Sequence, residues 1–488
     1  MDPRTPEPHD REEDGPKANG PEPAKPSKPT ETPKSPPLPE AAPPSKAPVP
    51  TPPSAVRPKP EAPPNAGAVR PTPGELAEPQ TTIRVSRDVD FPLSLLPQSL
   101  RRGPFREDAF TSVLHEPRTT VVVGRWLGAA LVVCFMTGLL SHVLQQPPTW
   151  LRDHLPSRPV NGYRVTQGLH VISGIAAIPL LGAKLWAVYP RLFGHKLLGD
   201  SHDPRLRKSK LFEWPPVRSV LHALERLGIA VLVSTMLLEL FIGLLNILEW
   251  YPWPFPFRQT HFWLAWVATG GLLVHVAAKG PMIAQHWRRG SVPGLRQRRA
   301  FLGAVTVAAV AVTATTAGQT VPWLRRLTLF APRRPDLGEL GLPVTRTAAQ
   351  ANTTVTPPDW RLRIDGPRPY ELTMDQLLAL PQSESRLPIA CVEGWSASAH
   401  WSGVRLRDLL ARAGAPPTAR VRVTSLEANG PYRVMEMPAA FAQDPLTLLA
   451  LRVNGRVLTA DHGYPARIIA PNRPGVLQTK WVARLEVI

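Results

Sequence analysis

The stretch Ile389-Ala390-Cys391-Val392-Glu393-Gly394-Trp395-Ser396 lies in the polar C-terminal part of a 488-residue chain and holds one of its two cysteines. Two cysteines do not make a disulfide framework, so any thiol chemistry has to be single-site. Cys134 lies among apolar residues and is expected to be a small buried hydrophobe. Cys391 stands in a loop-like context that gives no packing reason for a thiol, which makes it the candidate reactive group.

Further stretches of the C-terminal part extend the pattern around Cys391. They are Trp401-Ser402-Gly403-Val404-Arg405-Leu406-Arg407-Asp408-Leu409-Leu410, Leu449-Ala450-Leu451-Arg452-Val453-Asn454-Gly455, His462-Gly463-Tyr464-Pro465-Ala466-Arg467 and Lys480-Trp481-Val482. Together with the Cys391 loop they resemble the sulfite oxidase family of molybdopterin-dependent oxidoreductases, and within it the periplasmic methionine sulfoxide reductase catalytic subunits. The resemblance covers most of residues 345–488 and implies an enzyme.

The resemblance also implies which residues hold the cofactor, Mo-molybdopterin. Cys391 matches the cysteine whose thiolate ligates molybdenum, and a soft thiolate suits that role chemically. The positions that match the family's contacts to the pterin and its phosphate are Ser425, His462, Arg467, Gln478, Thr479 and Lys480. Arg and Lys side chains suit a phosphate. Without Cys391, His462 and Arg467 would instead be interpreted as ordinary surface residues before a strand.

The family implies the substrate only in outline, because its members transfer an oxygen atom to or from a sulfoxide or a small oxyanion. Arg433 and Arg473 are candidate positive side chains near the metal. The stretch Arg473-Pro474-Gly475-Val476-Leu477-Gln478 departs from the Tyr-Gly-Trp-Lys stretch of the sulfoxide reductases. Residues 345–488 also leave no room for the dimerisation domain that sulfite-oxidising members generally carry. Both substrate classes therefore stay open at this point.

Short alternating apolar runs predict strands at 360–364, 420–424 and 466–470, and two segments at 374–380 and 405–413 suit short helices. An α+β domain follows. About 140 residues are enough for one hydrophobic core.

Five apolar segments precede this domain, at 120–143, 166–189, 220–248, 261–281 and 300–322. Each is near the roughly 20 residues that a helix needs to cross a bilayer, so five crossings are predicted. The net charge of +19 is concentrated beside these segments, which is typical of membrane topology and does not indicate nucleic acid. Basic residues precede the first segment and separate the second from the third and the fourth from the fifth. We therefore expect the N-terminus in the cytoplasm and the C-terminal domain outside the plasma membrane.

Histidines inside the apolar segments are candidates for function, because ionisable groups are costly in a membrane. His261 and His275 are 14 residues apart, close to four helical turns, and share one face. Two stacked imidazoles at that separation suit two haems at different depths. The arrangement resembles the b-type cytochrome subunits of formate dehydrogenases and hydrogenases, which exchange electrons with a membrane quinone.

By depth we pair His170 with His261 for an outer haem b and His222 with His275 for an inner one. In these cytochrome subunits the second histidine ligand of the inner haem generally comes from the first helix. The matching position here is near Arg125 and holds no histidine. One haem only, or participation of His142, remain alternatives. A further alternative is that isolated histidines merely bond between helices.

The fifth apolar segment opens with Arg298-Arg299-Ala300-Phe301-Leu302-Gly303, which resembles a twin-arginine export signal placed internally. Such signals carry folded domains across the membrane, as a cofactor-loaded domain requires. The alternative is that the two arginines only flank a helix.

The sequence thus predicts a multidomain chain: a disordered Pro-rich tail (1–85), a membrane-proximal segment (86–118), a four-helix cytochrome (119–290), a fifth membrane helix (291–323), a linker (324–344) and a molybdopterin domain (345–488). We expect electrons to pass between a membrane quinone, haem b and molybdenum, with reduction of a small oxo-compound. The alternatives are a sulfite dehydrogenase that passes electrons to quinone, and a non-catalytic membrane-anchored binding module.

Overall fold

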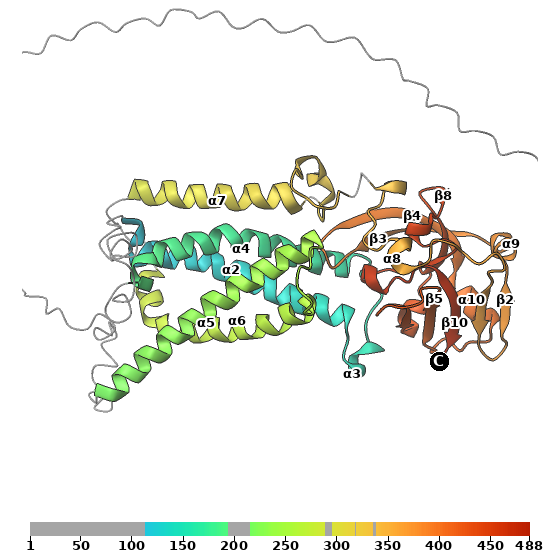
Figure 1. Cartoon of the computed structure of the whole chain (residues 1–488), viewed down its shortest axis with the longest axis horizontal. Coiled ribbons are helices and arrows are strands. Elements are labelled where there is room, and N and C mark those ends of the chain that lie inside the picture. The colour runs from blue at the N-terminus through green and yellow to red at the C-terminus, as the bar shows by residue number, and fades with distance from the viewer. Residues whose placement is uncertain (1–112, 194–214, 288–294, 318, 335–337) are drawn as a thin grey trace, which may run out of the picture. The chain divides into compact units, whose positions relative to one another are not determined.

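The computed structural model describes residues 113–193, 215–287, 295–317, 319–334 and 338–488, and the structural statements below refer to these ranges (Figure 1). The predicted disordered tail lies outside them. So do most of the basic residues that were used to predict the topology.

Long helices make up the first part of the described chain. They are α2 (Pro117–Gln145), α4 (Gly162–Phe193), α5 (Pro215–Leu248), α6 (Phe257–Trp287) and α7 (Leu295–Ala317), with the single turn α3 (Thr149–Arg152) and the short 3-10 turns η3 (Val113–His115) and η6 (Pro322–Leu327) between or beside them. All five long helices are long and apolar enough to cross a membrane. The five predicted crossings are therefore confirmed by length and composition, with ends a few residues from the predicted ones.

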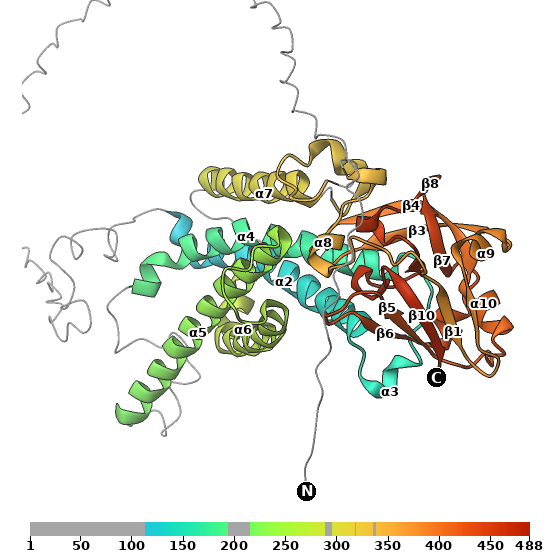
Figure 2. The ribbon, with the colours of Figure 1, turned by 45° about the vertical axis from the view of Figure 1, so that its right-hand side comes forward.

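The membrane helices pack around α4. α2 lies along α4, α5 lies along α6, and α7 packs on the other side of α4 (Figure 2). Leu127, Ala177, Leu181, Leu232, Met236 and Ala268 form a buried cluster that joins α2, α4, α5 and α6. A third of the most apolar window of α4 is buried, against 6–11% for the other four helices. Their outward side chains thus have the apolar character that lipid requires.

The C-terminal part contains two five-stranded sheets. Its elements are η7 (Glu339–Gly341), α8 (Ala348–Ala351), β1 (Leu362–Asp365), β2 (Tyr370–Leu372), α9 (Met374–Ala379), β3 (Ser383–Ala390), β4 (Ser396–Arg405), α10 (Leu406–Arg412), β5 (Val421–Ser425), β6 (Val434–Met437), α11 (Ala439–Ala442), β7 (Leu448–Val453), β8 (Arg456–Val457), η8 (Ala460–His462), β9 (Arg467–Ile469), η9 (Gly475–Leu477) and β10 (Val482–Val487). The first sheet has the order β2-β1-β10-β5-β6, and the second has β3-β4-β7-β8 with β9 also paired to β7. The pair β1 and β10 is parallel, and the other pairs are antiparallel. The predicted α+β fold is confirmed, including all three predicted strands and both short helices.

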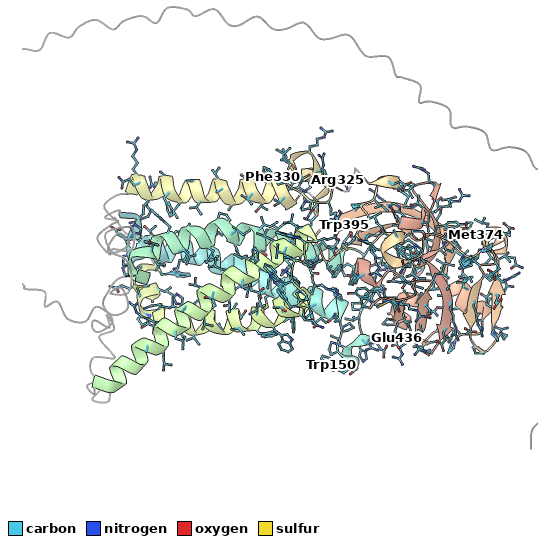
Figure 3. The ribbon with its side chains drawn as sticks, in the orientation of Figure 1. Trp150, Arg325, Phe330, Met374, Trp395 and Glu436 are labelled. Carbon is cyan, nitrogen blue, oxygen red and sulfur yellow. The ribbon has the colours of Figure 1, made fainter. Side chains whose placement is uncertain are left out.

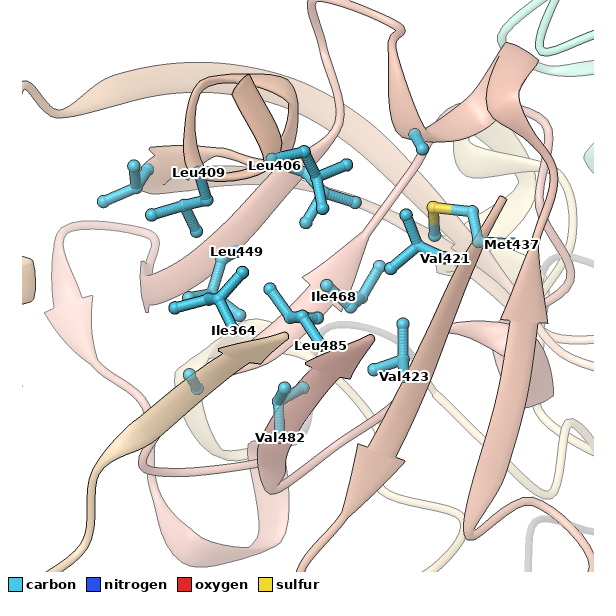
Figure 4. Close-up of a cluster of buried hydrophobic side chains, with 14 of the residues drawn as sticks. Ile364, Leu406, Leu409, Val421, Val423, Met437, Leu449, Ile468, Val482 and Leu485 are labelled. Atoms are coloured by element: carbon cyan, nitrogen blue, oxygen red, sulfur yellow. The ribbon is translucent and has the colours of Figure 1, made fainter. Parts of the chain in front are cut away.

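The second sheet is buried on both faces, which follows from the run of apolar residues in β7. Successive side chains of a strand point to opposite faces. Leu449 and Leu451 therefore join the core between the two sheets (Figure 4), whereas Leu448 and Ala450 join a second cluster that also contains Cys391. The loop after β3 thus begins inside a packed core.

The ends of the membrane helices are joined to the C-terminal domain by buried contacts. Leu155, which follows α3, belongs to the core between the sheets, and Val143 and Leu144 of α2 pack against that core. The side chain of Asn472 accepts a hydrogen bond from the Tyr163 backbone N–H (2.7 Å) and donates one to the Pro156 carbonyl (2.9 Å). Burial of apolar side chains at this junction favours one fixed placement of the two parts.

Candidate molybdenum and haem sites

Cys391 begins a tight loop between β3 and β4. The Cys391 N–H donates to the Trp395 carbonyl (2.9 Å), and the Gly394 N–H donates to the Cys391 carbonyl (3.1 Å). The positive φ of Gly394, 87°, suits glycine. The thiol is buried, with its sulfur 3.7 Å from Thr345 Oγ1. Figure 3 labels Trp395 of this loop where the sheets meet the helix ends.

Burial, followed by the charge of Glu393, raises the pKa of the Cys391 thiol well above its usual range. A metal ligand has to be the thiolate, so binding of a metal here would release the proton. A neutral, enclosed thiol is also protected from general oxidation. The loop therefore fits a cysteine that is ionised only by its metal.

Two cations lie beside the thiol. Arg467 is buried, donates from its NH1 nitrogen to the His462 carbonyl (3.0 Å) and lies over the Trp401 ring. The Lys480 ammonium donates to the carbonyls of Asp461 (2.7 Å) and Arg346 (2.8 Å). Burial lowers the pKa of Arg467 to about 10, and burial with the charge of Arg467 lowers the pKa of Lys480 to about 7. The charge of Cys391 acts on both cations, so the three groups lie close enough to interact electrostatically.

Several polar side-chain atoms of the predicted pterin contacts lack a hydrogen-bond partner among the described residues. They are Arg467 Nε, Gln478 Oε1 and Thr479 Oγ1, all buried. Buried polar atoms without partners are costly, and two desolvated cations beside them would gain from an anion. A group with phosphate oxygens and heterocyclic donors would satisfy this set, so the residues present fit a phosphorylated pterin.

The other two predicted pterin contacts are already bonded within the chain. His462 is buried, with Nδ1 2.8 Å from Thr459 Oγ1 and Nε2 3.3 Å from the Leu342 carbonyl, and burial lowers its pKa. Ser425 Oγ donates to the Lys480 carbonyl (2.9 Å). Both residues therefore support Arg467 and Lys480, and their direct contact with a pterin stays a prediction.

The two arginines suggested near the metal have other surroundings. Arg433 is exposed. Arg473 is buried, and its guanidinium donates to the carbonyls of Leu477 (2.9 Å) and Glu436 (2.8 Å). Those bonds tie Arg473 to β6 and to the loop before β10, and a contribution of either arginine near the metal stays a prediction.

A buried acid, Glu393, lies within the metal loop itself. Glu393 is 6% exposed, and its Oε2 atom has no hydrogen-bond partner among the described residues. Burial raises the pKa of Glu393, while its bond to Cys391 and the charges of Arg258 and Arg333 oppose that rise. Arg258 is the second residue of α6, where it is exposed and donates to the Tyr432 hydroxyl, so one of these charges comes from the membrane part. Sequence reasoning gave it no role at the site.

The predicted outer histidine pair meets between α4 and α6. The ring centres of His170 and His261 are 6.0 Å apart, with their planes at 84°. His170 Nδ1 is 2.9 Å from the Cys134 carbonyl, and His261 Nδ1 is 2.7 Å from a carboxylate oxygen of Glu239. His170 thus has an acceptor for Nδ1, whereas His261 Nδ1 lies within ion-pair distance of Glu239 without a hydrogen bond.

The other histidines are less defined. His142 stacks on Phe262, with ring centres 4.0 Å apart. His275 is half-buried in α6, 14 residues beyond His261. The backbone of His222 lies in α5, but its side chain is outside the described residues, so the inner pair stays a prediction. Sequence reasoning missed Glu239, although one acid within an apolar helix is itself a signal.

Comparison with known proteins adds the family of the C-terminal domain. Residues 349–488 match the family model described as oxidoreductase molybdopterin binding domain. The chain is 32% identical over 160 residues to mitochondrial sulfite oxidase of Drosophila melanogaster, covering 27% of this chain and 28% of that protein. It is 31% identical over 171 residues to the protein-methionine-sulfoxide reductase catalytic subunit of Gluconobacter oxydans, covering 31% and 53%.

Two further matches are shorter. A putative protein-methionine-sulfoxide reductase subunit of Azospira oryzae is 36% identical over 115 residues, covering 24% of this chain and 43% of that protein. The solved sulfane dehydrogenase SoxCD from Paracoccus pantotrophus has 27% identity and a TM-score of 0.26, covering 28% and 40%. The chain thus spans about half or less of the length of these relatives. The C-terminal domain is a molybdopterin-binding oxidoreductase domain of the sulfite oxidase family, which favours an enzyme over a binding module.

Proposed function

We propose that this protein is a membrane-bound oxidoreductase that passes electrons from a membrane quinol, through haem b, to a molybdenum site that reduces a small oxo-compound. With an S-oxide as substrate, the quinol gives up two electrons and two protons, and the S-oxide becomes a thioether and water. The reverse direction is the second candidate: sulfite and water become sulfate, and a quinone takes up two electrons and two protons.

The observation that carries the proposal is the spacing of His170 and His261. One metal-to-imidazole bond is about 2 Å long, and the ring centre lies about 1 Å beyond its nitrogen, so two imidazoles on opposite sides of one iron have centres about 6 Å apart. The measured 6.0 Å agrees with this value. Glu239 and the Cys134 carbonyl supply the acceptors that metal-bound histidines usually have at the other nitrogen.

A second, inner haem between His222 and His275 is part of the proposal, as the sequence predicted. Molybdopterin would be held by Cys391 at the metal and by Arg467, Gln478, Thr479 and Lys480 at the pterin and its phosphate, with His462 and Ser425 beside them. The bound cofactor supplies oxygen-atom transfer and two-electron chemistry. This chain contributes the enclosing pocket, the thiol ligand and the buried positive charge.

We place the N-terminus in the cytoplasm and the C-terminal domain outside the plasma membrane. The exposed aromatic side chains Trp250, Tyr251 and Trp253 precede α6 at the end of the helices that carries the C-terminal domain, which is consistent with an outer interface. A quinone would then reach the haems from within the bilayer.

Sulfite oxidation is kept as the second candidate for a specific reason. The positive charge of Arg258 acts on Glu393 beside the metal loop, and a cation there suits an oxyanion. The relatives include both a sulfite oxidase and a methionine sulfoxide reductase subunit, so they do not choose the direction.

The test is metal analysis of the detergent-purified protein followed by mixing experiments. We expect about one molybdenum and one or two irons per chain. Quinol-reduced haem should be reoxidised by dimethyl sulfoxide or by methionine sulfoxide. If sulfite alone reduces the haem instead, the direction is reversed. Cys391→Ser should lose molybdenum and all substrate-linked haem changes while keeping its iron; a fully active Cys391→Ser protein would contradict the proposal.

A further inference from the structure

The carbonyl next to the metal-ligand candidate is held by two membrane helices. Gln167 of α4 donates from Nε2 to the Val392 carbonyl (3.0 Å), and Asn246 of α5 donates from Nδ2 to the same oxygen (3.2 Å). Gln167 is 8% exposed. A carbonyl oxygen has two lone pairs, so these two amides satisfy it fully.

The same loop also packs closely on α4. A side chain at Gly394 would place its Cβ atom 2.7 Å from Val171 Cγ2, which is too close for any residue other than glycine. On the far side of the loop, the Ser396 N–H donates to the Gln319 carbonyl (2.7 Å) after α7. The loop 391–396 therefore contacts α4, α5 and the segment after α7. These contacts fix its position on the membrane helices.

The seated loop lies above the histidine pair. Gln167 is three residues before His170 on α4, which is about 4.5 Å of helix rise and nearly the same face. Asn246 is seven residues after Glu239 on α5, two turns along the face whose carboxylate meets His261. Each amide donor therefore belongs to the helix that carries one part of the proposed haem site.

Asn246 is itself fixed. The Tyr251 hydroxyl donates to Asn246 Oδ1 (3.1 Å), which sets the amide so that its nitrogen faces Val392. The orientation is thus determined by two partners. A side chain that served only to fill space would not need this second bond.

We propose that Gln167 and Asn246 are positioning residues for electron transfer, which clamp the Val392 carbonyl so that Cys391 and His170 are joined by a short bonded route. The route runs from the Cys391 thiol through one peptide bond to Val392, across a hydrogen bond to Gln167, and along one helical turn to His170. The inference rests on the proposed function. Each substrate turnover moves two electrons along it, one at a time, between the haem and the molybdenum centre.

The test uses the complete protein with both cofactors bound and the variants Gln167→Met and Asn246→Leu, which keep the side-chain size and remove the donor. A photogenerated flavin radical reduces the haem in a flash, and the following haem reoxidation reports electron transfer to molybdenum without any substrate. We expect this reoxidation to slow by about 10- to 100-fold, because small misplacements of reacting groups have effects of that size. The rate of haem reduction by quinol should stay within about twofold of wild type. The same holds for the rate of dimethyl sulfoxide reduction when a viologen dye donates electrons directly to the molybdenum centre.

The matched control is Ser398→Ala. It removes another hydrogen bond between the two parts, from the Arg164 guanidinium to Ser398 Oγ (2.9 Å) in β4, which does not involve the Val392 carbonyl. This variant should transfer electrons at the wild-type rate. If it slows as much as Gln167→Met, the effect is general docking and the specific clamp is refuted.

The outcomes separate the inference from the function on which it rests. Wild-type protein that lacks molybdenum or haem, or that never reoxidises its haem after the flash, contradicts the proposed function. Wild-type protein that transfers electrons, with both variants transferring equally fast, overturns the clamp alone. Loss of one hydrogen bond costs only about 1 kcal/mol, so we expect both variants to fold. If one variant fails to accumulate, the other still removes one of the two donors to the Val392 carbonyl and serves as the test.

Discussion

The imidazole rings of His170 and His261 face each other at 6.0 Å with nearly perpendicular planes, although 91 residues separate them in the chain. Each ring is held from behind, His170 by the Cys134 carbonyl and His261 by Glu239. The spacing agrees with the proposal that these two rings bind one haem iron between them. Edge-to-face packing alone also allows a spacing of 6.0 Å, so loss of haem on substitution is what separates a ligand pair from a packed pair.

Substitution of either histidine should remove a haem. We expect His170→Ala and His261→Ala to lose one iron per chain and the matching share of b-type absorbance, because one axial nitrogen is insufficient for a stable bis-imidazole site. His142→Ala tests the alternative that His142 takes part, and because its ring stacks on Phe262 we expect this variant to keep its iron and its absorbance. Undiminished absorbance in both variants would refute the site. His275→Ala tests the inner haem separately.

Replacement of Glu239 should change the haem's potential and leave its binding intact. The carboxylate makes His261 more electron-rich, which favours ferric iron. We therefore expect Glu239→Gln to keep its haem and to show a more positive midpoint potential in a redox titration. A potential that is unchanged or lower would mean that Glu239 has no electronic effect on this site.

Lys480 should make the stability of the cofactor-free protein depend on pH. Its pKa is lowered from 10.5 to about 7, and the groups that face it are Arg467, Arg346, Asp461 and Cys391. Between these two pH values the unfolded chain binds the proton and the folded chain does not, so the free energy of unfolding rises with pH. The destabilisation is fully present below pH 7 and is relieved as pH rises toward 10.5.

The measurement compares thermal unfolding of wild type and Lys480→Met in detergent between pH 7 and pH 10. Stability of wild type relative to the variant should increase steadily over this range. A constant difference would show that Lys480 keeps its proton in the folded state. Bound cofactor should abolish the dependence, because a phosphate stabilises the charged lysine.

Arg299 offers a clean test of the proposed twin-arginine signal. Arg298 is buried and bonded to Thr119 (3.1 Å) and Glu116 (2.8 Å), so changing it disturbs the packing of α7 on α2. Arg299 is exposed. If the signal is real, Arg299→Lys should fold normally but leave the C-terminal domain inside, as judged by impermeant labelling of intact cells. Normal export would identify the arginines as helix flanks only.

Local patterns in the sequence were sufficient for the main architecture. Apolar runs of about 20 residues predicted five membrane helices, because a bilayer requires that length whatever surrounds the helix. Alternation predicted β1, β5 and β9 for a similar local reason. The Cys391 loop predicted the cofactor domain, which the family match confirmed.

The tertiary structure decided how those parts meet. It brought Arg467 and Lys480 within range of the charge of Cys391, and it supplied Glu239, which sequence reasoning passed over, as the ion-pair partner of His261. It also bonded Arg473 to the backbone carbonyls of Leu477 and Glu436, partners that its charge alone did not indicate. Charge and residue type are visible in a sequence, but their partners are not.

The sequence by itself thus determined the number of membrane helices, the class of the C-terminal domain and the candidate ligands. Only the tertiary structure decided that the metal loop rests on the helices that carry the histidines. Gln167 and Val392 are 225 residues apart, and Asn246 and Val392 are 146 apart. No local periodicity encodes such contacts. They form because the buried core at the junction fixes the two parts in one placement, and the buried carbonyl then requires donors from the surface it meets.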